Sequence, residues 1–180
     1  MGKQFSELSD DHKVFIADQK LFFVGTAAEE GRVNISPKGM DTLKVINQNK
    51  VVWLNLTGSG NETAAHLIKN NRMTIMFCAF EGKPLILRLY GKANIYHPKD
   101  HQYKKYESLF SDIPGARQII ELDIDLVQNS CGFGVPLMDY KEDRSILTDW
   151  AKTKGKEGME AYWKEKNTKS IDGFETNIND

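Results

Sequence analysis

The stretch that decides the fold is Val51-Val52-Trp53-Leu54-Asn55-Leu56-Thr57-Gly58-Ser59-Gly60-Asn61-Glu62-Thr63-Ala64-Ala65-His66-Leu67. Its first six residues are apolar apart from one asparagine, which predicts a buried strand. A loop with two glycines follows, and Ser59 and Glu62 match the S-x-x-E capping box that begins a helix. The stretch therefore predicts a strand, a loop and a helix that ends near Lys69.

Short apolar segments separated by turns lie on both sides of this stretch. Strands are predicted over residues 21–26, 32–36, 42–46, 51–56, 73–80, 85–96 and 120–126, and Pro37 and Gly39 are expected to end the second of them. Helices are predicted over residues 10–19 and from Pro98 onward, where Tyr103, Tyr106, Leu109 and Phe110 have helical spacing. Many short strands with peripheral helices indicate a mainly β fold, an antiparallel barrel with added helices.

Within the strand at 120–126, apolar residues alternate with Glu121, Asp123 and Asp125, which predicts one wet face. Residues 1–140 are expected to form one domain that includes the N-terminal helix, and residues 141–180 a charged helical extension of the same domain. Its helices are expected to be interrupted at Gly155 and Gly158. The residues after about Lys169 are expected to be frayed.

Composition excludes several function classes for this chain of 180 residues. A net charge of −1 at pH 7 offers no excess of cations for nucleic acid. No apolar run approaches the ~20 residues of a membrane span, and the N-terminus shows no apolar signal region. Two cysteines without metal spacing indicate reduced thiols and a cytoplasmic protein. The four histidines show no ligand spacing either, so no metal site is expected.

The loop before the predicted helix suits a phosphate. A helix start presents unpaired amides with a partial positive charge, and phosphates bind well there. Ser59, Asn61 and Thr63 add two hydroxyls and an amide, although the GK[ST] ending of a Walker A motif is absent. A plain capped helix after a glycine turn explains the same residues, so both interpretations stay open.

Three other segments carry polar residues that suit a ligand. Asn34, Ser36 and Lys38 end one strand, and Lys38 is placed to neutralise a phosphate in the glycine loop; an ordinary surface turn is the alternative. Arg88 interrupts an apolar strand, so it either holds an anionic ligand or pairs with an acidic residue. Cys131 has no histidine near it in sequence, which does not favour a nucleophile.

At these segments the sequence resembles the pyridoxamine 5'-phosphate oxidase-like flavoproteins, the FMN-binding split-barrel family. The resemblance to the family as a whole runs from about Leu21 to Ala93. Residues Ser130 to Tyr140 also resemble one branch of the family. The motifs of the resemblance are Gly31-Arg32-Val33-Asn34-Ile35-Ser36-Pro37-Lys38-Gly39, Trp53-Leu54-Asn55-Leu56 with Gly58 to His66, Asn70-Asn71-Arg72-Met73, and Leu89-Tyr90-Gly91-Lys92-Ala93.

The resemblance implies a six-stranded antiparallel Greek-key barrel and a homodimer with two FMN sites at the subunit interface. It implies that the strand from Arg32 to Lys38 and the loop from Asn61 to Ala64 hold the phosphate and ribityl chain. Trp53 and Leu54 would line the flavin ring. The expected cofactor-binding residues are therefore Asn34, Ser36, Lys38, Trp53, Leu54, Ser59, Asn61, Thr63, Ala64 and Arg88.

The sequence departs from the true oxidases at two places. They carry an Arg-Lys pair where this chain has Thr63-Ala64, and their C-terminal Trp and Arg have no counterpart in residues 141–180. A branch other than the vitamin B6 oxidases is therefore expected. The first hypothesis is an FMN-dependent oxidoreductase of unknown substrate and unknown catalytic residues. The alternatives are a non-catalytic flavin binder or redox sensor, and a relative that uses deazaflavin F420 or haem.

Overall fold

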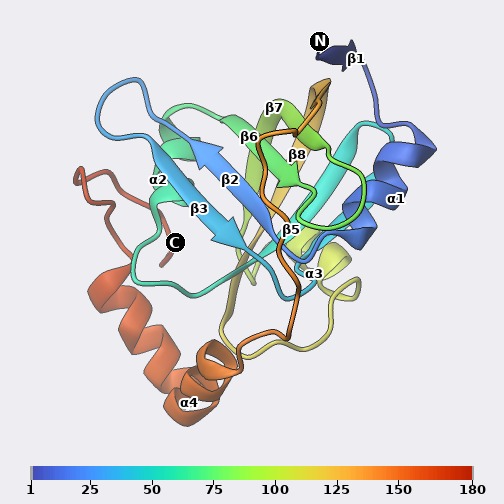
Figure 1. Cartoon of the computed structure of the whole chain (residues 1–180). Helices are drawn as coiled ribbons and strands as arrows, with labels where there is room; N and C mark the ends of the chain where they lie inside the picture. Colours follow the sequence, from blue (N-terminus) through green and yellow to red (C-terminus); the bar gives the residue numbers. More distant parts are fainter. Residues whose placement is uncertain (1, 180) are drawn as a thin grey trace.

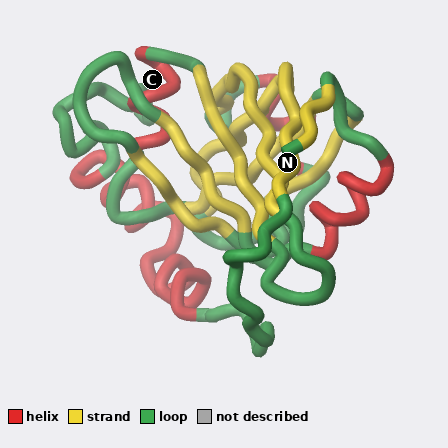
Figure 2. The backbone as a smooth tube through the Cα atoms, turned by 45° about the horizontal axis from the view of Figure 1, so that its top comes forward, coloured by secondary structure: helices red, strands yellow, loops and turns green. Residues whose placement is uncertain are grey.

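The architecture was obtained from a computed structural model, which describes residues 2–179. Its strands form a single sheet in which all pairs are antiparallel, in the order β3-β2-β6-β7-β8-β5-β4, with β1 paired to β8. The sheet is strongly curved and the helices lie around its sides (Figures 1 and 2). The elements are β1 (Lys3–Phe5), α1 (Asp10–Asp18), β2 (Phe22–Thr26), β3 (Asn34–Lys38), β4 (Leu43–Asn47), β5 (Lys50–Leu56), α2 (Glu62–Lys69), β6 (Arg72–Cys78), β7 (Ile86–Tyr96), α3 (His101–Glu107), β8 (Ala116–Ser130) and α4 (Ile146–Lys166).

This architecture confirms the predicted mainly β class with peripheral helices. The sheet holds eight strands in the described residues rather than the six that the resemblance implies. The central strands carry apolar side chains on both faces. The curved sheet encloses the side chains of one face, and helices cover the side chains of the other face. Trp53, Phe77 and Leu87 belong to the main core, and Tyr103 and Tyr106 of α3 pack on a second cluster against β5 and β8.

Two strand predictions differ from the structure. Pro37 does not end its strand: β3 runs from Asn34 to Lys38 and Pro37 pairs with Phe23. The strand tolerates a proline because β3 lies at one end of the sheet and needs hydrogen-bond partners on one side only. Leu109 and Phe110 lie beyond the end of α3, although Phe110 still packs on the second cluster.

Glu121 corrects the prediction of a wet face on β8. Asp123 and Asp125 are exposed as expected, but Glu121 is only 5% exposed. Its carboxylate accepts hydrogen bonds from Tyr106 Oη at 2.5 Å and Tyr96 Oη at 3.1 Å. Tyr96 ends the neighbouring strand β7, and Tyr106 comes from α3, which packs on this part of the sheet. Period-two alternation fails here because α3 buries the outer face.

The C-terminal residues are packed rather than frayed. The φ of Gly155, +65°, interrupts α4, as the sequence predicted for this glycine. After α4 the chain turns back to α2, so its end lies beside that helix (Figure 1). Asn167 and Thr176 are completely buried. Among residues 2–179, no helix is long and apolar enough to cross a membrane.

Candidate functional site

A cavity of about 410 Å³ lies where β3, the loop after β5, the start of α2 and the start of β8 meet. The antiparallel sheet brings these segments together although 85 residues separate Arg32 from Arg117 in the chain (117 − 32). The C-terminal segment contributes one wall through Ile171. The lining residues are mostly polar: Arg32, Val33, Asn34, Ser36, Lys38, Asn55, Gly58, Ser59, Gly60, Asn61, Glu62, Thr63, His66, Arg117 and Ile171.

Arg117 is the most deeply buried charge in the cavity, with 3% of its surface exposed. Its Nη1 donates to Gly60 O at 3.1 Å and to Asn167 Oδ1 at 2.6 Å, and both acceptors are neutral. Nε has no partner among the described residues. Burial lowers the pKa of the guanidinium to about 10, which still leaves it charged at neutral pH. A buried cation without a counter-ion is costly, so the cavity is arranged for an anion.

Lys38 supplies a second cation. Its Nζ lies 5.1 Å from the centroid of the Trp53 ring, and no carboxylate within residues 2–179 forms an ion pair with it or with Arg117. Burial, and then the charge of Arg117, lower the pKa of Lys38 to about 8. Each cation therefore disfavours the charged form of the other, and a bound anion would stabilise both charges.

The start of α2 faces the same cavity without a side-chain cap. Asn61 is the N-cap and its side chain makes no capping hydrogen bond. The predicted capping box is wrong, because Ser59 is exposed in the loop and the Glu62 carboxylate accepts from Ile171 N instead. In the described part of the chain, both amide atoms of the buried Asn61 side chain lack a partner. Unpaired donors at a helix start are a site for a negative group.

Neutral donors complete the wall along β3. Asn34 Nδ2 lies 3.1 Å from Ser36 Oγ and 3.4 Å from Thr63 Oγ1, which links the strand to the first turn of α2. His66, one turn further, is bonded through Nδ1 to Thr26 Oγ1 at 3.1 Å, while its Nε2 has no partner among residues 2–179. The cavity therefore offers hydroxyl, amide and imidazole groups beside its cations, a donor set that suits phosphate oxygens.

A family model described as pyridoxamine 5'-phosphate oxidase matches residues 8–131. The chain belongs to the pyridoxamine 5'-phosphate oxidase family. The match includes the whole sheet apart from β1 and every lining residue of the cavity except Ile171. The C-terminal segment lies outside it.

Similar proteins agree with this family assignment. The chain is 42% identical over 144 residues to the pyridoxamine 5'-phosphate oxidase family protein ustO of Aspergillus flavus. That alignment covers 77% of this chain, and the chain spans only 58% of the length of the relative.

Solved structures with the same fold have low sequence identity to this chain. HupZ of Group A Streptococcus aligns with a TM-score of 0.54 and 18% identity, over 68% of this chain and 98% of that one. A protein of Clostridium acetobutylicum related to general stress protein 26 gives 0.53 and 21%, over 67% and 86%. The FAD binding protein of Mycobacterium smegmatis gives 0.50 and 14%, over 70% and 97%. These likenesses confirm the split-barrel fold.

The structure brings six of the ten residues predicted for this family's cofactor to the cavity: Asn34, Ser36, Lys38, Ser59, Asn61 and Thr63. Trp53 and Leu54 are buried in the two apolar clusters, and Ala64 is buried in α2. The ring of Trp53 still contacts Lys38, which lines the cavity.

Arg88 does not line this cavity either, and its role in cofactor binding stays a prediction. It lies on β7 opposite Gln128, at the far end of β8 from Arg117, and its Nη1 donates to Ser130 Oγ at 3.2 Å. The antiparallel register of β7 and β8 sets this separation. Sequence reasoning also missed Arg117, which precedes the strand predicted at 120–126; β8 carries Glu121, Asp123 and Asp125 as well, so one more charge did not stand out.

Proposed function

We propose that the protein binds FMN and that the cavity beside α2 holds its phosphate group. The observation that carries this proposal is the pair of cations, Arg117 and Lys38, which face the cavity and form no ion pair with a carboxylate of residues 2–179. A phosphate dianion supplies the missing charge and accepts several charge-assisted hydrogen bonds. Membership of the pyridoxamine 5'-phosphate oxidase family and the fold shared with an FAD binding protein support a flavin.

Each part of the cavity has a role in this proposal. Arg117 and Lys38 bind the phosphate charge, and the uncapped amides of α2 bind its oxygens together with the Asn61 side chain. Thr63 and Ser36 orient the group through their hydroxyls. When bound, the flavin supplies hydride and electron transfer, and the protein supplies binding, orientation and charge.

The activity that we propose is a flavin-dependent oxidoreductase acting on a small molecule. Protein loaded with FMN is expected to be reduced by NADPH or NADH and to pass the electrons to an acceptor. Bleaching of the flavin absorbance on mixing is the measurement. Protein that holds FMN but is never bleached by either donor would favour the non-catalytic binder, and a Soret band in purified protein would favour haem.

Binding itself is tested by calorimetric titration of apoprotein with FMN and with riboflavin, which lacks the phosphate. FMN is expected to bind at least tenfold more tightly, because a hydrogen bond to a charged group contributes about 1.5 to 3 kcal/mol. Equal affinities would contradict a phosphate site in this cavity.

We also propose that the protein is a homodimer with the flavin at the interface. Val33 and Ile35, beside the FMN cavity, are 70% and 69% exposed, and they border a second, apolar cavity of about 510 Å³ on β2 and β6. Exposed apolar surface of this kind is typical of an association site. Light scattering should give twice 20.5 kDa, and a monomer mass with flavin bound would contradict the dimer.

A further inference from the structure

The ten residues after α4, 167–176, fold into a compact segment that we call the C-terminal clasp. Its backbone is tied to itself: Ser170 N donates to Phe174 O at 2.9 Å, and Thr176 N donates to Thr168 O at 3.0 Å. The Thr176 hydroxyl also donates to Asn167 O at 2.5 Å. A short polar segment with this many internal bonds holds a defined shape, and it lies against the FMN cavity.

Asn167 joins the clasp to the cavity from a completely buried position. Its Oδ1 accepts from Arg117 Nη1 at 2.6 Å, and its Nδ2 donates to Gly58 O at 3.2 Å. One amide group therefore fixes both the guanidinium and the glycine loop that precedes α2. Arginine has many rotamers, so fixing one of its nitrogens reduces the entropy that an incoming anion must otherwise remove.

The neutral charge of Asn167 matters as much as its position. A carboxylate at the same place would form a buried ion pair with Arg117 and cancel the charge that an anion needs. An amide oxygen satisfies one guanidinium nitrogen and leaves the positive charge uncompensated. Arg117 keeps this charge because none of its described acceptors is ionised.

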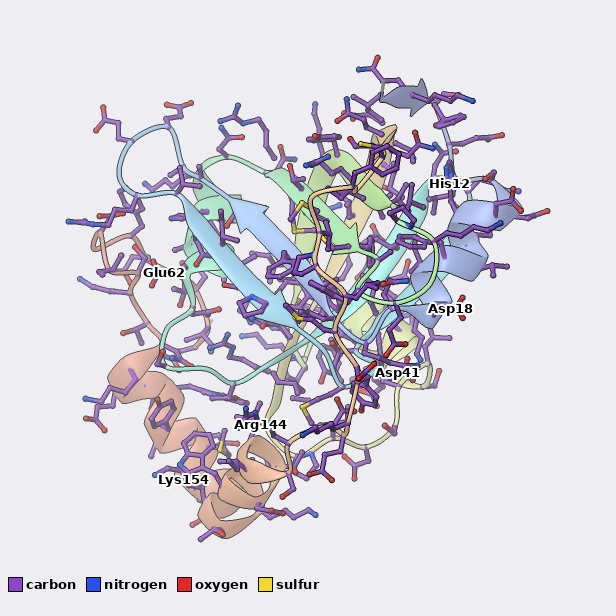
Figure 3. All side chains as sticks on the ribbon, in the orientation of Figure 1. His12, Asp18, Asp41, Glu62, Arg144 and Lys154 are labelled. Carbon is purple, nitrogen blue, oxygen red and sulfur yellow. The ribbon has the colours of Figure 1, made fainter. Side chains whose placement is uncertain are left out.

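The other end of the clasp binds the carboxylate of Glu62, a residue that lines the cavity. Glu62 stands in the first turn of α2, where its charge would oppose a bound phosphate. Ile171 N donates to both of its carboxylate oxygens, each at 3.1 Å. Asp172 pairs with Arg32 next to this contact. Glu62 lies on the side of the molecule that faces the clasp (Figure 3).

We propose that Asn167 is a positioning residue of the anion site, and that the clasp completes this site from outside the family-matched residues 8–131. This inference rests on the proposed function. It assigns to the C-terminal segment the task of orienting Arg117 toward a phosphate without neutralising it.

The test compares the affinities of FMN and riboflavin in Asn167→Asp and Asn167→Ala by calorimetry at pH 7. The aspartate is expected to lower FMN affinity most, by about a hundredfold, and the alanine by about tenfold, because a charge-assisted bond contributes that range. Riboflavin affinity is expected to change less than threefold in both. Glu175→Gln is the matched control, since Glu175 lies in the same segment in an exposed pair with Lys169.

The ratio of riboflavin to FMN dissociation constants separates the two proposals. A wild-type protein without preference for FMN contradicts the phosphate site itself. A wild-type preference that persists unchanged in Asn167→Asp overturns the role of Asn167 alone. If the Asn167 variants do not fold, Thr176→Val loosens the clasp without touching Arg117 and must lower the same ratio; an unchanged ratio there overturns the inference.

Discussion

Two buried charges on β8, four positions apart, are treated in opposite ways. Glu121 is 5% exposed and accepts hydrogen bonds from two tyrosines while Lys50 Nζ lies 3.2 Å away. Arg117 is 3% exposed and donates only to neutral acceptors among residues 2–179. The first charge is compensated by the protein, so its role is structural. The second is left for a ligand, and uncompensated buried charge is therefore the better marker of the functional site.

The largest expected effect on folding comes from removing the compensated charge. Glu121→Ala leaves Tyr96 and Tyr106 hydroxyls without an acceptor under α3 and should lower the free energy of unfolding by about 3 kcal/mol. Chemical denaturation measures it. Asp123→Asn, at an exposed neighbour on the same strand, is the control. A loss under 1 kcal/mol for Glu121→Ala would contradict the structural role of Glu121.

The Glu121 carboxylate should also make the stability of the protein depend on pH. Burial would raise the pKa of Glu121, but hydrogen bonds from Tyr106 and Lys50 and the Lys50 charge outweigh burial and lower it. Its stabilising contribution is therefore complete above the pKa of an unfolded glutamate, about 4.3, and is lost as pH falls below that value. The acid loss of stability should be smaller in Glu121→Gln than in the wild type.

Removing the uncompensated charge should have the opposite signature. Arg117→Met keeps much of the volume and removes a costly buried cation, so the stability of apoprotein is expected to stay the same or rise. FMN affinity should fall about a hundredfold, with riboflavin affinity changed less than threefold. Thermal melts and calorimetry give the two numbers. Strong destabilisation with unchanged FMN binding would show that Arg117 is structural as well.

Lys38 should make the affinity for FMN depend on pH. Its pKa of about 8 means that free protein above pH 8 must take up a proton to bind phosphate with a charged amine. FMN affinity should be highest near pH 7 and fall by up to about tenfold per pH unit above pH 8. Lys38→Met keeps the side chain over Trp53 and should remove this dependence. A wild-type profile that is flat to pH 9.5 would contradict the assignment.

Sequence patterns predicted the fold and part of the cavity for clear physical reasons. Apolar runs identify the strands because the curved sheet buries both faces of its centre, and the motifs of β3 and the α2 loop identify six lining residues. Arg88 stood out as a charge in an apolar run, whereas Arg117 precedes the predicted strand and shares β8 with three acidic residues. Only the strand register places Arg117 in the cavity and Arg88 at the far end of β8.

Long-range contacts explain the remaining differences. The Ser59–Glu62 capping box was a local expectation, and the structure overrides it because the Ile171 amide, 109 residues away, binds the Glu62 carboxylate. The clasp looked frayed because its polar residues form no apolar face. It is ordered by hydrogen bonds to Arg117 and to the glycine loop, which no local pattern reveals.

The smallest expected effect follows from this correction. Ser59→Ala should change the free energy of unfolding by less than about 0.5 kcal/mol, because Ser59 is exposed and does not cap α2. Replacing a serine that does cap a helix by alanine lowers the free energy of unfolding by about 1 kcal/mol. A loss of that size in chemical denaturation would restore the capping box.

Phosphorus NMR of bound FMN shows whether a phosphate dianion lies between the two uncompensated cations, Arg117 and Lys38. A phosphomonoester has a second pKa near 6, and nearby positive charge lowers it because the dianion is favoured. The resonance of bound FMN is expected to stay at its dianionic position down to about pH 5 in the wild type and to titrate at higher pH in Arg117→Met. A bound phosphate that titrates near pH 6 in the wild type, as free FMN does, would contradict the account.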